Sequence, residues 1–332
     1  MASEPLQVCL TGGTGFLGRH VARALVDAGV AVRCLSRSGG APFEHALLTA
    51  ASVDVLDLGA LTDAARGCAA MLHGAGLVSN RSKDARKVFD LHVTGTENAV
   101  NACKAAGVPR LVLISTSGTI AVGTDPDKVY TEDDPYAVQT TARWPYYRTK
   151  LFAEELALKA HGDGLTVVSV NPSLLLGPGD DEDGASTHSV RTFLEDGVPL
   201  SPPGGLAFVD VRDAADGVLR ALRRGRGGQR YLLNGANLTF HDFFERLARI
   251  SGKPGPKGRM PQLLRGALSW LPGTGPLTLG VGPVLSRNEL DLASHFWYCD
   301  ARLARDELGW RPRDPLQTLS DTVRDLEARA AW

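Results

Sequence analysis

The stretch "LTGGTGFLGRH", residues 10–20, joins a short apolar run to an amphipathic one. Gly13, Gly15 and Gly18 satisfy the pattern G-x-G-x-x-G, and Gly12, Gly15 and Gly18 satisfy the looser G-x-x-G-x-x-G equally well. Glycines at these places let a strand turn sharply into a helix, let the backbone approach a pyrophosphate, and let the helix pack closely on the strand. The pyrophosphate charge then faces the N–H groups that begin the helix. The stretch therefore predicts a dinucleotide-binding loop, in preference to a glycine turn with a structural role alone.

The segments that follow alternate short apolar runs with amphipathic stretches. Strands alternating with helices imply right-handed crossovers and a parallel sheet, and the continuous apolar character of the runs is typical of strands buried on both faces. The sequence thus predicts an α/β protein with a Rossmann-type doubly wound parallel sheet. The expected strands are 6–12, 31–37, 51–57, 69–76, 110–117 and 166–173, and the expected helices are 18–29, 61–67, 88–107 and 145–161.

The pattern becomes irregular beyond about residue 177. We expect residues 1–176 to form the dinucleotide-binding domain with the catalytic residues, and residues 177–332 to form mostly a smaller, irregular substrate-binding lobe. Segments around 204–235 are expected to return to the first domain. The elements predicted in this half are an acidic, glycine-rich loop at 177–186, a strand and a helix within 204–222, a strand at 230–235, a helix at 239–252 and an amphipathic helix at 315–330.

Composition excludes several classes of protein. The 332 residues carry a formal net charge of −1, without the basic patch that nucleic-acid binding usually needs. No apolar run reaches the roughly 18 residues of a membrane-spanning helix, and the N-terminus lacks a secretion signal, so we expect a cytoplasmic protein without membrane insertion. The cysteines are odd in number and show no metal-ligand spacing, which predicts buried thiols in a reducing compartment and no metal site. They are Cys9, Cys34, Cys68, Cys103 and Cys299.

The second expected strand ends in "CLSRSGG", residues 34–40, where the acidic residue that would bind a ribose 2′-hydroxyl is absent. Arg37 stands there with Ser36 beside it, 19 residues beyond Gly18. An arginine in this position accommodates a 2′-phosphate, so the sequence favours NADP(H) over NAD(H). The alternative is that Arg37 is a solvated surface charge. Asp57, after the third expected strand, could bond the adenine amino group or could equally cap a helix.

Further motifs follow the glycine loop in order: "LDL" at 56–58, "HGAG" at 73–76, "STSG" at 115–118, Tyr146-x-x-x-Lys150 and "NPSLLLGPGD" at 171–180. With them the chain resembles the extended short-chain dehydrogenase/reductases. It looks most like the branch that holds dihydroflavonol-4-reductase-like carbonyl reductases, 3β-hydroxysteroid dehydrogenases and NAD-dependent sugar epimerases. The resemblance extends from about residue 6 to 328 and is weakest at 253–298. It implies a small-molecule substrate and a homodimer formed through the helices at 88–107 and 145–161.

The resemblance implies a catalytic Ser/Thr, Tyr and Lys, with Tyr146 and Lys150 as the last two. One helical turn separates them, so they share a helix face, and a nearby ammonium lowers the pKa of a tyrosine from its ordinary value of about 10. Ser117 is the preferred hydroxyl, which would donate to the substrate oxygen as charge develops there. Alternation along a strand places Ser115 on the same face and Thr116 on the other. Ser115, Thr116 and Thr119 stay open as alternatives.

The resemblance also implies a set of ligand contacts. The substrate is expected at Val78, Thr119 and Trp144, and the nicotinamide beside Pro172 and Ser173. The complete set expected for the cofactor is Gly12, Thr14, Gly15, Phe16, Leu17, Gly18, Ser36, Arg37, Asp57, Leu58, Gly74, Ala75, Gly76, Tyr146, Lys150, Pro172 and Ser173.

These observations predict an NADP(H)-dependent oxidoreductase that interconverts a ketone and a secondary alcohol on a fairly apolar small molecule, with Tyr146 as proton donor or acceptor. The apolar segment 263–298 favours an apolar substrate pocket, or else it packs the lobe. One alternative is a nucleotide-sugar epimerase or dehydratase with tightly held NAD(P), for which Arg259, Arg287 or Arg302 could bind a diphosphate. A minor alternative is a non-catalytic NADP-sensing protein, against which the intact Ser–Tyr–Lys set argues.

Overall fold

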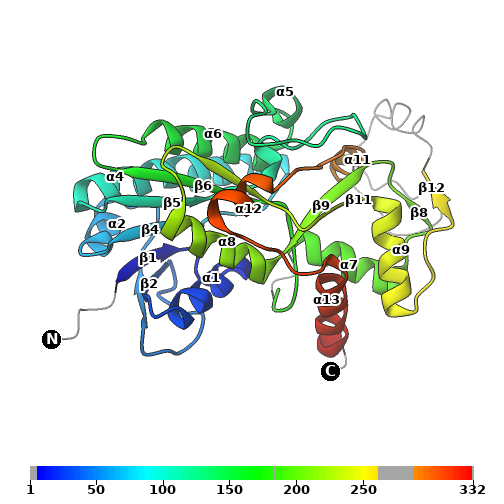
Figure 1. Ribbon diagram of the computed structural model, residues 1–332, viewed down its shortest axis with the longest axis horizontal. Coiled ribbons are helices and arrows are strands. Elements are labelled where there is room, and N and C mark those ends of the chain that lie inside the picture. Colours follow the sequence, from blue (N-terminus) through cyan, green and yellow to red (C-terminus); the bar gives the residue numbers. More distant parts are fainter. Residues whose placement is uncertain (1–5, 182–183, 261–286, 331–332) are drawn as a thin grey trace.

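The computed structural model describes residues 6–181, 184–260 and 287–330, and Figure 1 shows how their helices and strands are arranged. A seven-stranded sheet with all neighbours parallel lies at the centre of the larger lobe, in the order β10-β6-β5-β4-β1-β2-β3. The predicted α/β fold with a doubly wound parallel sheet is confirmed. The strands are β1 (Gln7–Thr11), β2 (Ala31–Ser36), β3 (Leu48–Ser52), β4 (Ala70–His73), β5 (Arg110–Ile114), β6 (Thr166–Pro172) and β10 (Arg230–Leu233).

The strand order changes direction between β1 and β4. The chain runs from β1 outward to β2 and β3, and then returns to β4 on the other side of β1. Ligands bind in open α/β sheets at such a switch point, outside the carboxyl ends of the strands. The loops that leave the two strands touch there, because a Cβ built on Gly12 would lie 2.7 Å from the carbonyl carbon of Gly74.

Helices cover both faces of this sheet (Figure 1). One face is covered by α1 (Phe16–Asp27) and α8 (Val211–Arg224), and the other by α2 (Leu58–Ala65), α4 (Gly95–Ala106) and α6 (Pro145–Lys159). Along β1, Val8 and Leu10 belong to the core under the first pair of helices, whereas Cys9 belongs to the core under the second group. Side chains alternate between the two faces of a strand, which explains this division. The long helix expected at 88–107 is α3 (Ala85–Phe89), a π-helical turn (Asp90–Thr94) and α4 in succession.

The third strand expected at 51–57 is wrong in its position. β3 ends at Ser52, and residues 53–57 turn toward α2 instead. Two aspartates explain the turn, because Asp54 accepts a hydrogen bond from the N–H of Leu56 and Asp57 accepts one from the N–H of Ala60, both at 3.0 Å. Side chains of this type offer the backbone partners outside a sheet, and the apolar run alone does not reveal them.

The smaller lobe contains a three-stranded sheet, β11-β9-β7, and a two-stranded one, β12-β8. Its core gathers apolar side chains from three helices, among them Phe193, Phe243 and Leu319. The expected strand and helix within 204–222 are β9 and α8, and β10 pairs with β6 in the main sheet. The elements not yet named are β7 (Leu174–Leu176), α7 (Ala185–Asp196), β8 (Leu200–Ser201), β9 (Gly205–Asp210), β11 (Ala236–Thr239), α9 (Phe240–Ser251), β12 (Gly258–Arg259) and α13 (Pro315–Ala330), with the connecting helices α5 (Val138–Thr141), α11 (Arg287–Leu292) and α12 (Arg302–Leu308).

Within the described ranges no helix combines the length and the apolar character needed to cross a membrane.

A network of ion pairs joins α8 to α13 and the segment before it. The Arg212 guanidinium lies 2.7 Å from both Asp210 and Asp321. Arg313 donates to Asp213 from its backbone N–H and from its side chain, at 2.8–3.0 Å. Burial alone would raise the pKa of Asp210, but the Arg212 side chain and N–H hold that pKa below its usual value. The network therefore anchors the smaller lobe to a helix of the larger one.

Replacing Asp213 by Asn should lower the free energy of unfolding by about 2–3 kcal/mol, because it leaves the largely buried Arg313 without its main counter-charge. Asp216→Asn is the matched control on the same helix. Its pair with Arg220 is more exposed, and such pairs contribute about 1 kcal/mol or less. Urea unfolding of the wild type and both variants measures the difference, and equal losses in the two variants would contradict this account.

Candidate active site

The glycines after β1 differ in the space around them: at Gly12 and Gly18 a side chain would collide with the backbone, whereas Gly15 has room for one. Gly12 adopts a positive φ of 74°, and a Cβ on Gly18 would lie only 2.0 Å from the Gly12 carbonyl oxygen. Gly15 differs, because a Cβ there would meet that oxygen at 3.5 Å and nothing else within 4 Å. Gly15 is also the N-cap of α1 and provides no side-chain cap, so the first N–H groups of the helix are left for a ligand. This open cradle fits the pyrophosphate of a dinucleotide.

The residues expected around the rest of the cofactor occupy the same edge of the sheet. Ser36 ends β2 half-buried, and Arg37 follows it with an exposed side chain. Asp57 caps α2 through the N–H of Ala60, so of its two possible roles the structure shows the cap. Thr14, Phe16, Leu17, Gly74 and Ala75 are half-buried, and Leu58 and Gly76 are exposed.

Two histidines that the sequence analysis did not single out lie beneath the turn after β4. The hydroxyl of Thr11 accepts hydrogen bonds from the N–H groups of Gly74 and Ala75, both at 3.2 Å, and lies 2.8 Å from Nδ1 of His73. Burial, and then the nearby charge of Lys150, lower the pKa of His73 to about 3. His73 is therefore neutral near pH 7 and holds the turn in place.

His92 supports the beginning of α6 in a similar way. Its Nε2 accepts from the N–H of Leu77 at 3.1 Å, so its Nδ1 carries the proton and donates to the Thr149 hydroxyl at 2.8 Å. Burial, followed by the charge of Lys150, lowers the pKa of His92 to about 2. The ring also meets the Tyr146 ring edge-on, with centroids 5.5 Å apart.

Pro172 and Ser173, expected beside the nicotinamide, lie at the carboxyl end of β6 and are buried. The Ser173 hydroxyl donates to the side chain of Asn234 at 3.2 Å. Ser173 thus joins β6 to the residue that follows β10.

Tyr146 and Lys150 stand one turn apart on α6, whose first helical residue is Pro145. Burial raises the pKa of Tyr146 to about 12, and a side-chain hydrogen bond with Thr116 acts in the opposite direction. Burial lowers the pKa of Lys150 to about 8, against the charge of Glu154. The Lys150 ammonium donates to the carbonyl oxygen of Ile114 at 2.5 Å. The expected lowering of the Tyr146 pKa is therefore not what the structure shows, because burial outweighs the other influences.

The four candidate hydroxyls after β5 point to different partners. Ser115 and Thr119 donate to the carboxylate of Glu154, Thr119 at 3.1 Å. Burial raises the pKa of the Cys299 thiol, and the Ser117 side chain opposes that shift. The Thr116 hydroxyl accepts a hydrogen bond from the N–H of Gly118 at 3.3 Å, and Thr116 is the one whose side chain lowers the pKa of Tyr146 against the effect of burial. The alternation argument fails because β5 ends at Ile114 and the residues Ser117–Thr119 form a 3-10 turn, so the two-residue period of a strand does not continue.

An aromatic cluster borders this turn. The Tyr147 ring lies 4.7 Å from the Trp297 ring and 5.0 Å from the Tyr146 ring, centroid to centroid. A Cβ on Gly118 would lie 2.4 Å from the Tyr147 ring, so only glycine admits that ring. Tyr147 and Trp297 are both partly exposed. Trp297 comes from a segment far along the chain and was not predicted from the sequence.

The three residues expected at the substrate differ in exposure. Val78 is 62% exposed. Trp144 is fully buried behind Trp297, and its indole N–H donates to Asp291 at 3.2 Å. Thr119 is fully buried as well. Neither Thr119 nor Trp144 therefore offers a surface to a ligand in this conformation, and the part of the expected apolar segment at 263–286 lies outside the described residues.

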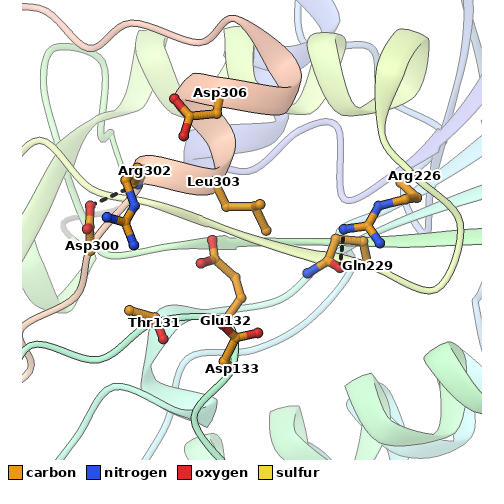
Figure 2. Close-up of a pocket in the computed structure, with 9 residues that line it drawn as sticks. All are labelled: Thr131, Glu132, Asp133, Arg226, Gln229, Asp300, Arg302, Leu303 and Asp306. Atoms are coloured by element: carbon orange, nitrogen blue, oxygen red, sulfur yellow. Dashed lines mark hydrogen bonds between the residues drawn. The ribbon is translucent and has the colours of Figure 1, made fainter.

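A polar pocket of about 190 Å³ lies elsewhere, between the segment before α5 and α12 (Figure 2). Arg302 lines it together with four carboxylates, those of Glu132, Asp133, Asp300 and Asp306. None of the residues expected at the cofactor or the catalytic centre is among its lining residues. In the part of the chain that the structure describes, no group of three or more His, Cys, Asp or Glu side chains is arranged to hold a metal ion.

Comparison with known proteins gives consistent matches. Residues 8–233 match the model of the NAD dependent epimerase/dehydratase family. A putative dihydroflavonol 4-reductase from Synechocystis sp. is 31% identical over 320 residues, which cover 95% of this chain and 92% of that protein. The solved structure of gox2253 superposes with a TM-score of 0.82 at 25% identity, covering 98% of both chains. PA4631, a nucleoside-diphosphate-sugar epimerase from Pseudomonas aeruginosa, superposes with a TM-score of 0.75 at 25% identity, also over 98% of both chains.

The two kinds of glycine predict different effects of substitution. Gly15→Val should weaken NADPH binding at least tenfold, or about 1.4 kcal/mol, with little change in melting temperature, because the added side chain enters the open cradle. Gly18→Ala should lower the melting temperature, because its Cβ collides with the Gly12 carbonyl oxygen. Calorimetric titration with NADPH and thermal unfolding separate the two effects. Normal NADPH binding by Gly15→Val would contradict the assignment of the cradle.

Proposed function

Because the chain belongs to the NAD dependent epimerase/dehydratase family, we propose that it is an NADP(H)-dependent oxidoreductase interconverting a ketone and a secondary alcohol on an apolar small molecule. A relative named as a reductase aligns with nearly the whole chain. The observation that carries the proposal is that Tyr146 stands one helical turn from Lys150 on α6, with the Thr116 side chain acting on the pKa of Tyr146, on the edge of the sheet that holds the glycine cradle.

The bound nicotinamide would supply or accept the hydride. Reduction of a ketone leaves negative charge on the substrate oxygen, which needs a hydrogen-bond donor and then a proton. With a pKa of about 12, Tyr146 keeps its proton near pH 7, as a donor must. The Thr116 side chain lowers the pKa of that hydroxyl against the effect of burial, and it would orient the hydroxyl toward the substrate. The Lys150 ammonium, held by the carbonyl of Ile114, would place positive charge beside the tyrosinate that remains.

The aromatic cluster supports an apolar substrate. Tyr147 and Trp297 leave ring surface partly exposed beside Tyr146 and the Thr116 turn. Rings of this kind bind apolar and aromatic groups through large contact areas. The substrate would therefore present its carbonyl to Tyr146 and an apolar or ring-bearing side to Tyr147 and Trp297.

We also propose that the protein forms a homodimer and that it is located in the cytoplasm. Phe89 and Phe152, on α3 and α6, are each 41% exposed and are available to an interface. All five cysteines are free and buried, which suits a reducing compartment.

The nucleotide-sugar epimerase is a second candidate, favoured by the similarity to PA4631. It needs cations for a diphosphate. Arg302 lies among four carboxylates in the polar pocket (Figure 2), and their repulsion of an anion disfavours this residue as a diphosphate anchor.

One assay separates the candidates. The pure protein is mixed with NADPH and a panel of aryl, steroid and aliphatic ketones, and absorbance of NADPH is followed. Net NADPH consumption supports the reductase. A cofactor that stays bound while sugar nucleotides interconvert would establish the epimerase instead, and cofactor binding with neither reaction would indicate a sensor.

Substitution of the two rival hydroxyls identifies the one that acts with Tyr146. Thr116→Val should lower kcat by roughly 100-fold, within the range typical of a positioned proton donor or its partner, whereas Ser117→Ala should stay within a few-fold of the wild type. Tyr146→Phe is the reference and should abolish ketone reduction while NADPH still binds. The reverse order of effects for Thr116 and Ser117 would restore Ser117 as the catalytic hydroxyl.

Arg37 should determine cofactor preference. Arg37→Asp removes the cation that would meet the 2′-phosphate and adds an acceptor for a ribose 2′-hydroxyl, so the ratio of kcat/KM for NADPH over NADH should fall by at least tenfold. Arg86→Asp is a control, since the exposed Arg86 side chain pairs with Asp90 one turn further along the same helical segment. An unchanged ratio in Arg37→Asp would show that Arg37 does not bind the 2′-phosphate.

A further inference from the structure

Glu154 is a fully buried carboxylate beside the candidate active site. It lies on α6 one turn beyond Lys150 and two turns beyond Tyr146. Residues four apart lie on the same face of a helix, so the three side chains form one row along α6. A buried acid in such a row needs partners, because an unpaired buried charge is strongly destabilising.

Five side chains from outside α6 supply those partners, and all of them direct hydrogens toward the carboxylate. Oε2 accepts from a serine and a threonine of the turn after β5 and from an asparagine of β6. Oε1 meets a tyrosine hydroxyl and an arginine of β10. The partners are Ser115, Thr119 at 3.1 Å, Asn171 at 2.6 Å, Tyr136 at 3.5 Å and Arg230 at 3.5 Å.

Two of these bonds come from residues that flank Thr116 in the chain. Ser115 precedes it, Thr119 follows it by three residues, and both donate to Glu154. The Thr116 carbonyl oxygen itself accepts from Asn171 at 3.1 Å and lies 3.0 Å from the Thr119 hydroxyl oxygen. The residues that hold the Thr116 segment in place, Ser115, Thr119 and Asn171, therefore all bond the carboxylate of Glu154.

The same carboxylate acts on Lys150 through space. The charged and titratable groups that interact with the ammonium are His73 on β4, His92 on the π-helical turn and Glu154 on α6. Both histidines are neutral near pH 7, so Glu154 is the group of this set that can favour the ammonium. Burial lowers the pKa of Lys150 to about 8, and Glu154 opposes that shift. Burial raises the pKa of Glu154, and Arg230, which faces it from β10, opposes that shift together with the hydrogen bonds from Ser115 and Asn171, so these groups favour the charged carboxylate.

We propose that Glu154 is a positioning residue that holds the Thr116 turn against Tyr146 and keeps Lys150 charged, an assignment that rests on the function proposed above.

Two substitutions separate these effects. Glu154→Gln keeps an oxygen for Ser115, Thr119 and Asn171 but removes the negative charge. Without that charge the Lys150 ammonium loses its proton at lower pH, so the alkaline limb of the kcat profile for ketone reduction should move to lower pH by roughly one unit. The rate on the plateau below that limb should stay near that of the wild type.

Glu154→Ala removes the acceptor as well as the charge. Its kcat on the plateau should fall roughly 10- to 100-fold, as expected when a catalytic hydroxyl loses its alignment, while the Kd for NADPH stays unchanged. Glu155→Gln is the matched control, since Glu155 is the next residue on α6 and its carboxylate is 41% exposed. It should leave both the rate and the pH profile unchanged.

A structural role alone would lower the rate equally at every pH. The proposal is therefore overturned if the limb of Glu154→Gln coincides with that of the wild type, or if both Glu154 variants match Glu155→Gln.

Hydrogen–deuterium exchange tests the hold on the turn without any substrate. The N–H groups of Ile120 and Ala121 bond the Ser117 carbonyl at 3.0 and 2.8 Å, and their exchange should become faster in Glu154→Ala but not in Glu155→Gln. Unchanged exchange in Glu154→Ala overturns the proposal. A wild type that reduces no ketone would refute the proposed reaction, and the exchange measurement would still decide whether Glu154 holds the turn.

Discussion

The buried carboxylate of Glu154 joins three separate segments of the chain to α6 beside the candidate site. Its partners come from the turn after β5, from β6 and from β10. A buried acid without them would destabilise the fold by several kcal/mol, so these segments must be in place together. β10 follows β6 by nearly sixty residues of chain that belong largely to the smaller lobe. The geometry of the candidate site therefore depends on β10. This strand joins the main sheet only after the chain has entered the smaller lobe and returned.

Burial also sets the protonation states across the site. His73 and His92 are held neutral, with pKa values of about 3 and 2, while Tyr146 retains its proton and Lys150 has a pKa of about 8. Near neutral pH Lys150 thus carries the positive charge among these four groups, with Glu154 one turn away on α6, and its charge is little screened by solvent. That arrangement favours negative charge on the tyrosine or on a substrate oxygen beside it, which is the charge that ketone reduction creates.

The sequence predicts those features that depend on short-range spacing. The glycine loop, the alternation of strands and helices, and the four-residue separation of Tyr146 from Lys150 are local patterns, and the sheet that follows from them is confirmed. The hydroxyl that acts on Tyr146 could not be predicted in this way. β5 ends at Ile114 and a turn follows, so the alternation of side chains along a strand no longer tells which residue faces α6. Glu154 was also missed, since an acid on an amphipathic helix usually faces solvent. Trp297 reaches the site from a segment about 180 residues beyond Gly118, and no local pattern carries such a contact.

The contact of Tyr147 and Trp297 with Gly118 joins the aromatic cluster to the turn that carries Thr116. A Cβ at residue 118 would collide with the Tyr147 ring at 2.4 Å and touch Trp297 at 3.0 Å, so the glycine allows both rings to approach the turn that carries Thr116. The rings border this turn, and the Thr116 side chain acts on Tyr146. With the function proposed above, any change that moved the turn to admit a different substrate would also move Thr116 relative to Tyr146. Substrate selectivity and proton transfer would then be coupled through the two residues of backbone that separate Thr116 from Gly118.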